Sequence, residues 1–180
     1  MRREMAILDE KEVYRDKWLT VNQLETTVDG VLGSYTTVNK NDCVAVILQC
    51  EDQYLLIASY RFPIRSTEWE VLAGQIEPEE SAEHAAHREL LEETGVDTCL
   101  QAYGSFYIIP GLSDQKVHIF AGEISLEKKR RIVNYTDDVD EILDREFYSM
   151  QEICEMIQNG QVRDTITMAC FFVAQNFIRG

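Results

Sequence analysis

Alternating apolar and polar residues in the first part of the chain predict a β-rich start. TVNQLETTV alternates, Asp29-Gly30 marks a turn and VLGSYTTV resumes the β-branched pattern, so short strands are expected over residues 13–38. CVAVILQ and QYLLIASY follow as two strands on either side of Cys50-Glu51-Asp52, and the first is apolar enough for the interior of a sheet. The sheet is expected to continue over residues 68–72.

The spacing of apolar residues becomes helical after residue 80. Ser81 is suited to the N-cap of a helix, and Gly95 is suited to its C-terminal end. The apolar residues between them have the spacing of a core-facing stripe. The residues expected in this stripe are Ala82, Ala85, Ala86, Leu90 and Leu91.

The second half of the chain predicts further strands and two more helices. Strands are expected near residues 100–109, 116–123 and 144–148. Ser149 and Glu152 form a capping box for a short helix that ends at Gly160. Asp164 is suited to cap the last helix, whose apolar face is expected to contain Ile166, Ala169, Cys170, Val173 and Phe177. The whole pattern predicts a mixed β-sheet sandwiched between helices, an α/β or α+β domain.

Composition supports one globular domain and argues against several other classes. The chain has 180 residues, of which 45% are apolar and 27% charged. Its longest aliphatic run, residues 44–48, has the length of a strand, so we expect a cytoplasmic protein without a membrane partner. Five scattered cysteines without a CxxC pair indicate neither a disulfide framework nor a zinc site. The net charge of −15 argues against a nucleic-acid partner.

The acidic residues of the predicted helix suggest a more specific chemistry. Glu89 and Glu93 are four residues apart, so they share one helical face, where two like charges cost about 0.2–0.5 kcal/mol. A glutamate-rich helix is usually only a solvated face. However, hard divalent cations take oxygen ligands, and carboxylates at this spacing can share one cation. A small phosphorylated ligand is then compatible with the negative charge of the protein.

The spacing of the glycine, glutamate and arginine residues between Gly74 and Val96 forms a complete motif. Five residues separate Gly74 from Glu80, and seven more precede Arg88. The remainder of the segment completes GX5EX7REUXEEXGU, in which U is aliphatic. This pattern is the Nudix box, and the chain resembles the Nudix hydrolase family.

The resemblance implies a metal-dependent hydrolase. The expected cofactor is Mg²⁺, with Mn²⁺ as the alternative. Its implied ligands are the main-chain carbonyl of Ala73 and the carboxylates of Glu80, Glu89 and Glu93. Glu92 and Arg88 are the implied catalytic supports, and Arg88 would orient the carboxylates through hydrogen bonds.

Features outside the box resemble the ADP-ribose and nucleoside diphosphate sugar pyrophosphatases of this family. Pro110 follows Gly95 by 15 residues, and the PG-x-S-acid sequence adds Gly111 and Ser113 as substrate contacts. An ordinary Pro-Gly turn is the alternative interpretation. The chain departs from the family pattern at Leu72, where most relatives have proline.

Four further residues are implied in substrate binding by the same resemblance. Arg61 would lie near the substrate diphosphate, and Glu70, in the sheet segment before the box, is a further expected substrate contact. Trp18 and Tyr35 match positions at which similar enzymes place aromatic rings against the adenine. An aromatic face suits this role because it can stack on any base. Packing in the core is the alternative for both aromatic residues.

The catalytic base is expected in the acidic segment TDDVDEILDREF. Counting back from the capping box, Glu141 occupies the place of the family's loop glutamate. Asp138 and Asp140 are the close alternatives. The alternative interpretation is that these acidic residues only form a solvent-exposed loop.

The predicted reaction is hydrolysis of the diphosphate bond of ADP-ribose, which yields AMP and ribose 5-phosphate, or of a related nucleoside diphosphate sugar. GDP-mannose or another nucleotide sugar is the alternative substrate, and a non-catalytic Nudix ligand-sensing module is the alternative from another class. The resemblance also implies a homodimer. Residues 1–40 are expected to form an N-terminal antiparallel strand extension that mediates dimerisation, and residues 41–180 the Nudix domain, with the box at 74–96.

Overall fold

The computed structural model describes residues 3–136 and 142–175, and this part of the chain divides into two compact units. The first unit extends to Asp42 and includes Tyr107–Lys116. The second unit contains Cys43–Phe106 and the described residues from Val117 onward. We refer to them as the first unit and the second unit.

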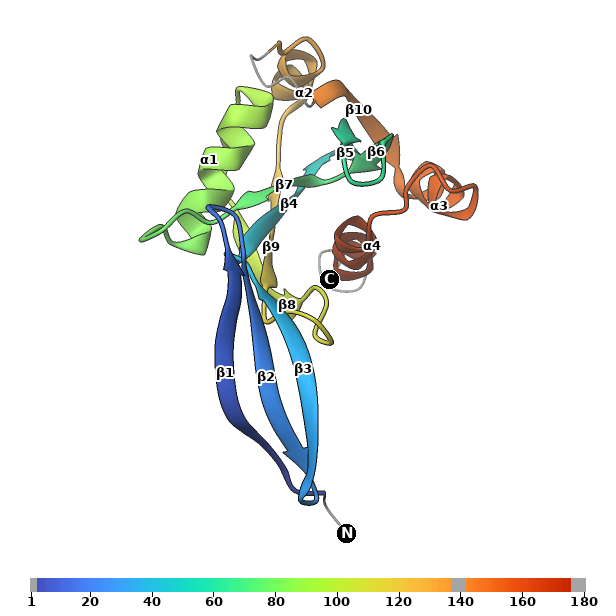
Figure 1. The fold of residues 1–180 in the computed structure, drawn as a ribbon. Coiled ribbons are helices and arrows are strands. Elements are labelled where there is room, and N and C mark those ends of the chain that lie inside the picture. The colour runs from blue at the N-terminus through green and yellow to red at the C-terminus, as the bar shows by residue number, and fades with distance from the viewer. Residues whose placement is uncertain (1–2, 137–141, 176–180) are drawn as a thin grey trace. The chain divides into compact units, whose positions relative to one another are not determined.

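The first unit is built on a three-stranded antiparallel sheet of β1 (Met5–Arg15), β2 (Thr20–Val28) and β3 (Val31–Asn39) in that order (Figure 1). Positive φ angles at Asp29 and Gly30 make the tight turn that the Asp-Gly pair predicts. The sequence prediction, which began at residue 13, missed most of β1. Every residue of that strand is exposed, so it lacks the one-sided apolar pattern that would have identified it.

The second unit contains a mixed sheet whose main path runs β10-β5-β4-β9-β8, with β6 beside β5 and β7 beside β4. Parallel pairing of β4 with β9 makes the sheet mixed, since β4 pairs antiparallel with β5 and β7. The strands are β4 (Cys43–Cys50), β5 (Gln53–Arg61), β6 (Ser66–Glu70), β7 (Leu72–Gln75), β8 (Gln101–Tyr107), β9 (Lys116–Glu123) and β10 (Ile142–Ser149).

One predicted strand is divided in the structure. Residues 68–72 were expected to be continuous, but β6 ends at Glu70 and β7 begins at Leu72. The chain changes partner at this point, because Glu70 pairs with Ile57 of β5 and Leu72 pairs with Val46 of β4. Val71 therefore lies at a crossover between two neighbouring strands.

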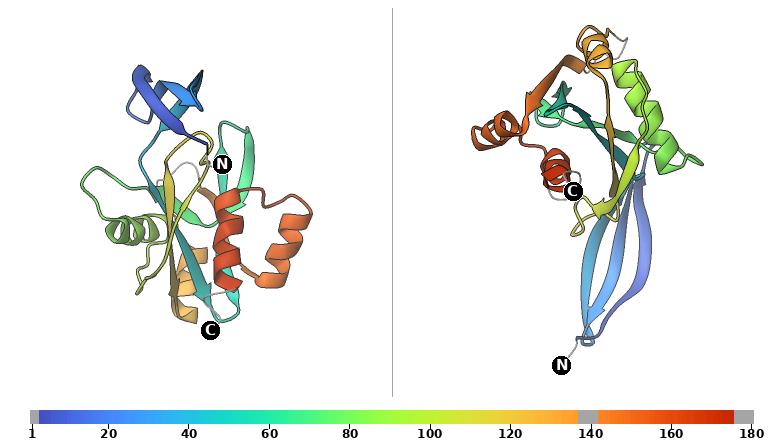
Figure 2. Two further views of the ribbon diagram at one scale, coloured as in Figure 1. Left: turned by 90° about the horizontal axis from the view of Figure 1, so that it is seen from below. Right: turned by 180° about the vertical axis from the view of Figure 1, so that it is seen from behind.

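Helices lie on both sides of this sheet, as Figures 1 and 2 show for α1 and α4. They are α1 (Ala82–Thr94), α2 (Leu126–Val133), α3 (Met150–Gln158) and α4 (Thr165–Val173). Ser81, Ser149 and Asp164 cap their helices as predicted, and the capping box of α3 is complete. The sequence prediction missed α2, a short and highly charged helix. The expected sheet sandwiched between helices is confirmed.

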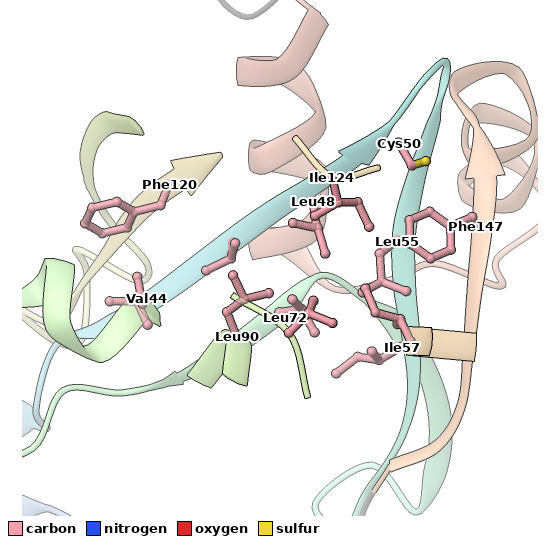
Figure 3. Close-up of a cluster of buried hydrophobic side chains, with 14 of the residues drawn as sticks. Val44, Leu48, Cys50, Leu55, Ile57, Leu72, Leu90, Phe120, Ile124 and Phe147 are labelled. Atoms are coloured by element: carbon pink, nitrogen blue, oxygen red, sulfur yellow. The ribbon is translucent and has the colours of Figure 1, made fainter. Parts of the chain in front are cut away.

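The core of the second unit lies between the sheet and α1 (Figure 3). Val44, Val46 and Leu48 alternate along β4 toward the same cluster as Leu90 of α1. On α4, Cys170 and Phe171 are also buried, and Phe171 meets the ring of Tyr54 edge to face at 5.6 Å. Phe177, which was expected on the apolar face of α4, lies outside the described residues.

The predicted core stripe of α1 was wrong at Leu91. This side chain is 52% exposed, whereas Leu90 is fully buried. Leu91 lies about 100° around the helix from Leu90, which places it on the solvent side of α1. The buried line of α1 instead runs through Ala86, Leu90 and Thr94.

No helix formed by residues 3–136 and 142–175 is both long and apolar enough to span a membrane. The cysteines are free thiols.

The contrast between the two leucines gives a stability test. Leu90→Ala should lower the free energy of unfolding by about 2–5 kcal/mol, since it leaves a cavity in the core. Leu91→Ala, one position along the same helix, should change it by no more than about 0.5 kcal/mol. Urea unfolding of both variants measures the difference, and equal losses would contradict the assigned orientation of α1.

Candidate active site

Glu89 lies against the main chain of β7, and this contact explains the glycine at position 74. The Glu89 side chain is only 13% exposed. A Cβ atom on Gly74 would overlap its carboxylate, far inside the 3.0 Å limit that real Cβ atoms respect. Only glycine at position 74 lets the Glu89 carboxylate approach the strand this closely.

Glu93 is more deeply buried than Glu89, one helical turn further along α1. Within the described part of the chain its Oε2 atom is buried and has no hydrogen-bond partner. Burial raises the pKa of Glu93 well above its ordinary value, and the nearby Glu89 and Glu70 carboxylates raise it further. Burial also raises the pKa of Glu89, although Arg88 opposes the rise. The site thus holds two carboxylates in surroundings that disfavour their charge.

Arg88 joins the two ends of the motif. Its guanidinium donates two hydrogen bonds to Glu80, from Nε to Oε1 and from Nη2 to Oε2, each 3.0 Å long. The same side chain donates to the main-chain oxygen of Gln75 at 2.9 Å and to Glu89 Oε1 at 2.8 Å. A weaker contact of 3.2 Å reaches the half-exposed Glu92. Arg88 therefore fixes the Glu89 carboxylate between α1 and β7.

The two hydrogen bonds from Arg88 stabilise the ionised form of Glu80. The hydrogen bonds from Arg88, together with the N–H group of Glu77, lower the pKa of Glu80 to about 2. The hydrogen bond to Glu80 is also the largest cause that raises the pKa of Arg88. Each carboxylate oxygen of Glu80 thus accepts a hydrogen bond from Arg88, and its role as a metal ligand stays a prediction.

Arg61 and Glu70 form an ion pair beside these glutamates. The Nη2 atom of Arg61 lies 2.5 Å from Oε1 of Glu70, whose side chain is 8% exposed. Burial raises the pKa of Glu70, while the charge of Arg61 acts in the opposite direction. Both residues also act electrostatically on Glu93. The structure therefore brings Arg61, Glu70, Glu89 and Glu93 into one neighbourhood.

Sequence reasoning missed Arg145, which holds the C-terminal end of α1. This buried arginine of β10 donates from Nε to the main-chain oxygen of Glu93 at 2.6 Å. It also donates to the main-chain oxygen of Tyr135 at 3.3 Å and lies over the Tyr135 ring. That ring fills the space where Gly95 would carry a Cβ, and Gly95 has a φ of 68°. A single arginine in a strand-like segment gives no signal of such a role.

The donor set around Glu89 and Glu93 fits a hard divalent cation. The partly buried carboxylates of Glu89 and Glu93 share a helical face beside the strand that contains Ala73, and Glu93 Oε2 lacks a hydrogen bond. A bound cation would satisfy that oxygen and offset the repulsion between the carboxylates. Residues 3–136 and 142–175 contain no metal-binding group of three or more His, Cys, Asp or Glu side chains. A site here would thus combine two carboxylates with main-chain oxygen or water.

The other predicted substrate residues belong to the first unit. Tyr35, Pro110 and Ser113 line a pocket of about 450 Å³, and the Tyr35 hydroxyl donates to the main-chain oxygen of Gly111. Trp18 lies elsewhere in the unit, in a turn held by Asp16, and is 57% exposed. Glu141, Asp138 and Asp140 lie outside the described residues.

Residues 39–169 match the family model for the NUDIX domain, and the chain therefore belongs to the Nudix hydrolase family. The family prediction from the box is confirmed. An ADP-ribose pyrophosphatase of Bacillus subtilis (strain 168) is 28% identical over 173 residues, which cover 91% of each chain. A methanol dehydrogenase activator of Bacillus methanolicus is 31% identical over 69% of this chain and 67% of its own length.

A solved structure supports the fold. The crystal structure of an ADP compounds hydrolase aligns with a TM-score of 0.78, covering 98% of this chain and 95% of that one. The sequence identity is 21%, so this similarity concerns the fold alone.

The contact between Gly74 and Glu89 can be tested without reference to activity. Gly74→Ala should lower the free energy of unfolding by about 1–3 kcal/mol, because the added methyl group displaces a packed side chain. In a Glu89→Ala background the same substitution should be nearly neutral, since the obstructing carboxylate is gone. A double-mutant cycle measured by urea unfolding gives the coupling. Additive effects would contradict the contact.

Proposed function

We propose that this Nudix hydrolase cleaves the diphosphate bond of ADP-ribose in a Mg²⁺-dependent reaction and releases AMP and ribose 5-phosphate. The observation that carries the metal dependence is the buried Glu89–Glu93 pair with its unpaired Glu93 oxygen. Nudix hydrolases generally use a divalent metal. Similarity to an ADP-ribose pyrophosphatase along 91% of the chain supports the choice of substrate.

Glu89, Glu93 and the main-chain oxygen of Ala73 would hold the cation. Bound there, a divalent ion neutralises diphosphate charge and lowers the pKa of a coordinated water. Arg88 keeps the Glu89 carboxylate in place through the bonds that also join it to Glu80 and Gln75. Glu92, half exposed beside Arg88, remains the accessory carboxylate in this proposal.

Arg61 and Glu141 are proposed for the two remaining chemical tasks. The side chain of Arg61 is 40% exposed although it contacts Glu70, so a substrate diphosphate can reach this side chain. Its planar donors suit phosphate oxygens. Glu141 is proposed as the base that takes a proton from the attacking water, with Asp138 and Asp140 as alternatives.

The base of the nucleotide is proposed to bind at aromatic residues of the first unit. The pocket lined by Tyr35, Pro110 and Ser113 also contains Tyr107, and its size suits a heteroaromatic ring. Trp18, which is exposed in its own turn, would provide a separate stacking face.

The first unit is proposed to mediate a homodimer. Strand register places six apolar or aromatic residues on one face of its sheet: Met5, Ile7, Leu24, Val28, Val31 and Tyr35. Met5 and Val31 are each 71% exposed, and Ile7 is 62% exposed. A contiguous apolar face of this kind is unusual on a monomer and suits an interface. A second copy of the chain is the proposed partner.

Glu93→Gln tests the metal-dependent mechanism. The substitution keeps the size of the side chain but removes the anionic ligand, so Mg²⁺-dependent turnover should fall more than about 100-fold, beyond the usual loss for an outer-shell partner. Glu83→Gln removes an exposed glutamate from the first turn of the same helix and should leave turnover unchanged. Unaltered turnover of Glu93→Gln would show that the mechanism is wrong.

Substrate choice is tested by a panel of phosphorylated compounds. ADP-ribose, GDP-mannose, ADP-glucose, diadenosine polyphosphates and nucleoside triphosphates should be assayed with Mg²⁺, with identification of each product. We expect ADP-ribose to give the highest kcat/KM, with AMP as a product. Preference for GDP-mannose would reject the assigned base contacts, and lack of turnover would favour a ligand-sensing module.

The dimer is tested by a charge on the apolar face. Val31→Glu should weaken self-association at least about tenfold, or 1.4 kcal/mol, because it places a carboxylate in the proposed interface. Thr36→Glu, on the opposite face of the same strand, is the control. Light scattering over a concentration series measures both variants. A monomeric wild-type protein with full activity would contradict the proposal.

A further inference from the structure

Val71 occupies a position where the sheet leaves its N–H group without a ladder partner. The preceding residue, Glu70, pairs with β5, and the following residue, Leu72, pairs with β4. Val71 is only 1% exposed, so water does not readily replace a strand partner. A buried N–H at such a crossover needs an acceptor from elsewhere in the fold.

Thr167 of α4 provides that acceptor. Its Oγ1 accepts the Val71 N–H at 3.1 Å, and Thr167 is fully buried. The same hydroxyl donates to Oδ2 of Asp164 at 2.8 Å, which leaves a lone pair for Val71. Asp164 Oδ2 also accepts the Thr167 N–H at 2.7 Å as the helix cap. The Asp164 carboxylate thus orients the hydroxyl while it caps α4.

A second set of contacts joins the start of α4 to β6, the strand that precedes Val71. Arg163, the residue before the cap, donates to both carboxylate oxygens of Glu68 and to the Ser66 hydroxyl. Glu68 is nearly fully buried. Residues 163–167 are therefore attached by hydrogen bonds to β6 at Ser66 and Glu68 and to the crossover at Val71.

We propose that Thr167, oriented by Asp164, is a positioning residue for the active site. The crossover that it holds lies between Glu70, which pairs with Arg61, and Ala73, whose main-chain oxygen is a proposed metal ligand. Gly74, which contacts Glu89, follows directly. A displaced Val71 would shift all three groups relative to Glu89 and Glu93. This inference rests on the metal site of the proposed function.

The test uses variants that separate the hydroxyl from the shape of the side chain. Thr167→Val is nearly isosteric but cannot accept the Val71 N–H, whereas Thr167→Ser retains the hydroxyl. Mn²⁺ binding to the substrate-free protein, followed by electron paramagnetic resonance, is the first readout. The Kd for Mn²⁺ should rise about tenfold or more in Thr167→Val, as for loss of an outer-shell partner, and should remain near the wild-type value in Thr167→Ser.

Cys170→Ala controls for a general loss of α4 packing, because Cys170 is fully buried on the same helix, while the hydrogen bond to Val71 comes from Thr167. It should lower the melting temperature and leave the Kd for Mn²⁺ unchanged. If Thr167→Val lowers the melting temperature but binds Mn²⁺ as tightly as wild type, Thr167 is only structural and the positioning role is wrong. If Thr167→Val does not fold, Asp164→Ala decides, because it removes the oxygen that orients the Thr167 hydroxyl: a weaker Kd is expected, and an unchanged Kd overturns the proposal.

The result also distinguishes this inference from the proposed function. Wild-type protein that does not bind Mn²⁺, or Glu93→Gln protein that binds it normally, would overturn the metal site and the positioning role together. Normal wild-type binding that is lost in Glu93→Gln and unchanged in Thr167→Val would overturn the positioning role alone.

Discussion

The burial of two like-charged carboxylates on one face of α1 is the constraint around which the second unit is arranged. Exposed glutamates at this spacing would repel each other only weakly, but Glu89 and Glu93 are removed from most of the solvent that would screen them. Folding alone gives no reason to keep such a pair, because apolar residues would pack there without the desolvation cost. In the proposed function the pair is a cation site, and a bound cation would offset the repulsion between the two carboxylates.

Several residues of the motif serve to hold this unfavourable pair in a defined geometry. Gly74 lets Glu89 approach the strand, and the forked bond between Arg88 and Glu80 anchors the guanidinium that in turn holds Glu89. Arg145 secures the main chain at Glu93 from a strand outside the motif. Within the motif, Gly74 and Arg88 thus fix the position of Glu89 by close packing and hydrogen bonds. Arg145, which is far away in the sequence, fixes the main chain at Glu93.

The sequence predicted best where local chemistry determines structure. The Asp29-Gly30 turn and the caps at Ser81, Ser149 and Asp164 depend on neighbouring residues and were predicted correctly. The errors arose where packing partners decide the outcome. β1 has no buried face, and Leu91 differs from Leu90 by its angle around the helix. The strand is interrupted at Val71 because the residues on either side of it pair with two different strands, β5 and β4. Arg145 and Thr167 could not be identified, since their significance depends on main-chain groups that they meet only in the folded chain.

The division of the chain into two units separates chemistry from recognition in the proposed function. The acidic residues and Arg61, which are proposed to act on the diphosphate common to all nucleotide sugars, belong to the second unit. The aromatic residues proposed for the base belong to the first unit, where contacts such as the one between Tyr35 and Gly111 fix their surroundings. Substitution of a charged residue at the carboxylates is expected to be poorly tolerated, because it would leave the remaining charged groups without a partner of opposite charge. Stacking on an aromatic face tolerates many bases. The two sets of residues can therefore change independently, and the Nudix box by itself identifies the reaction class more firmly than the substrate.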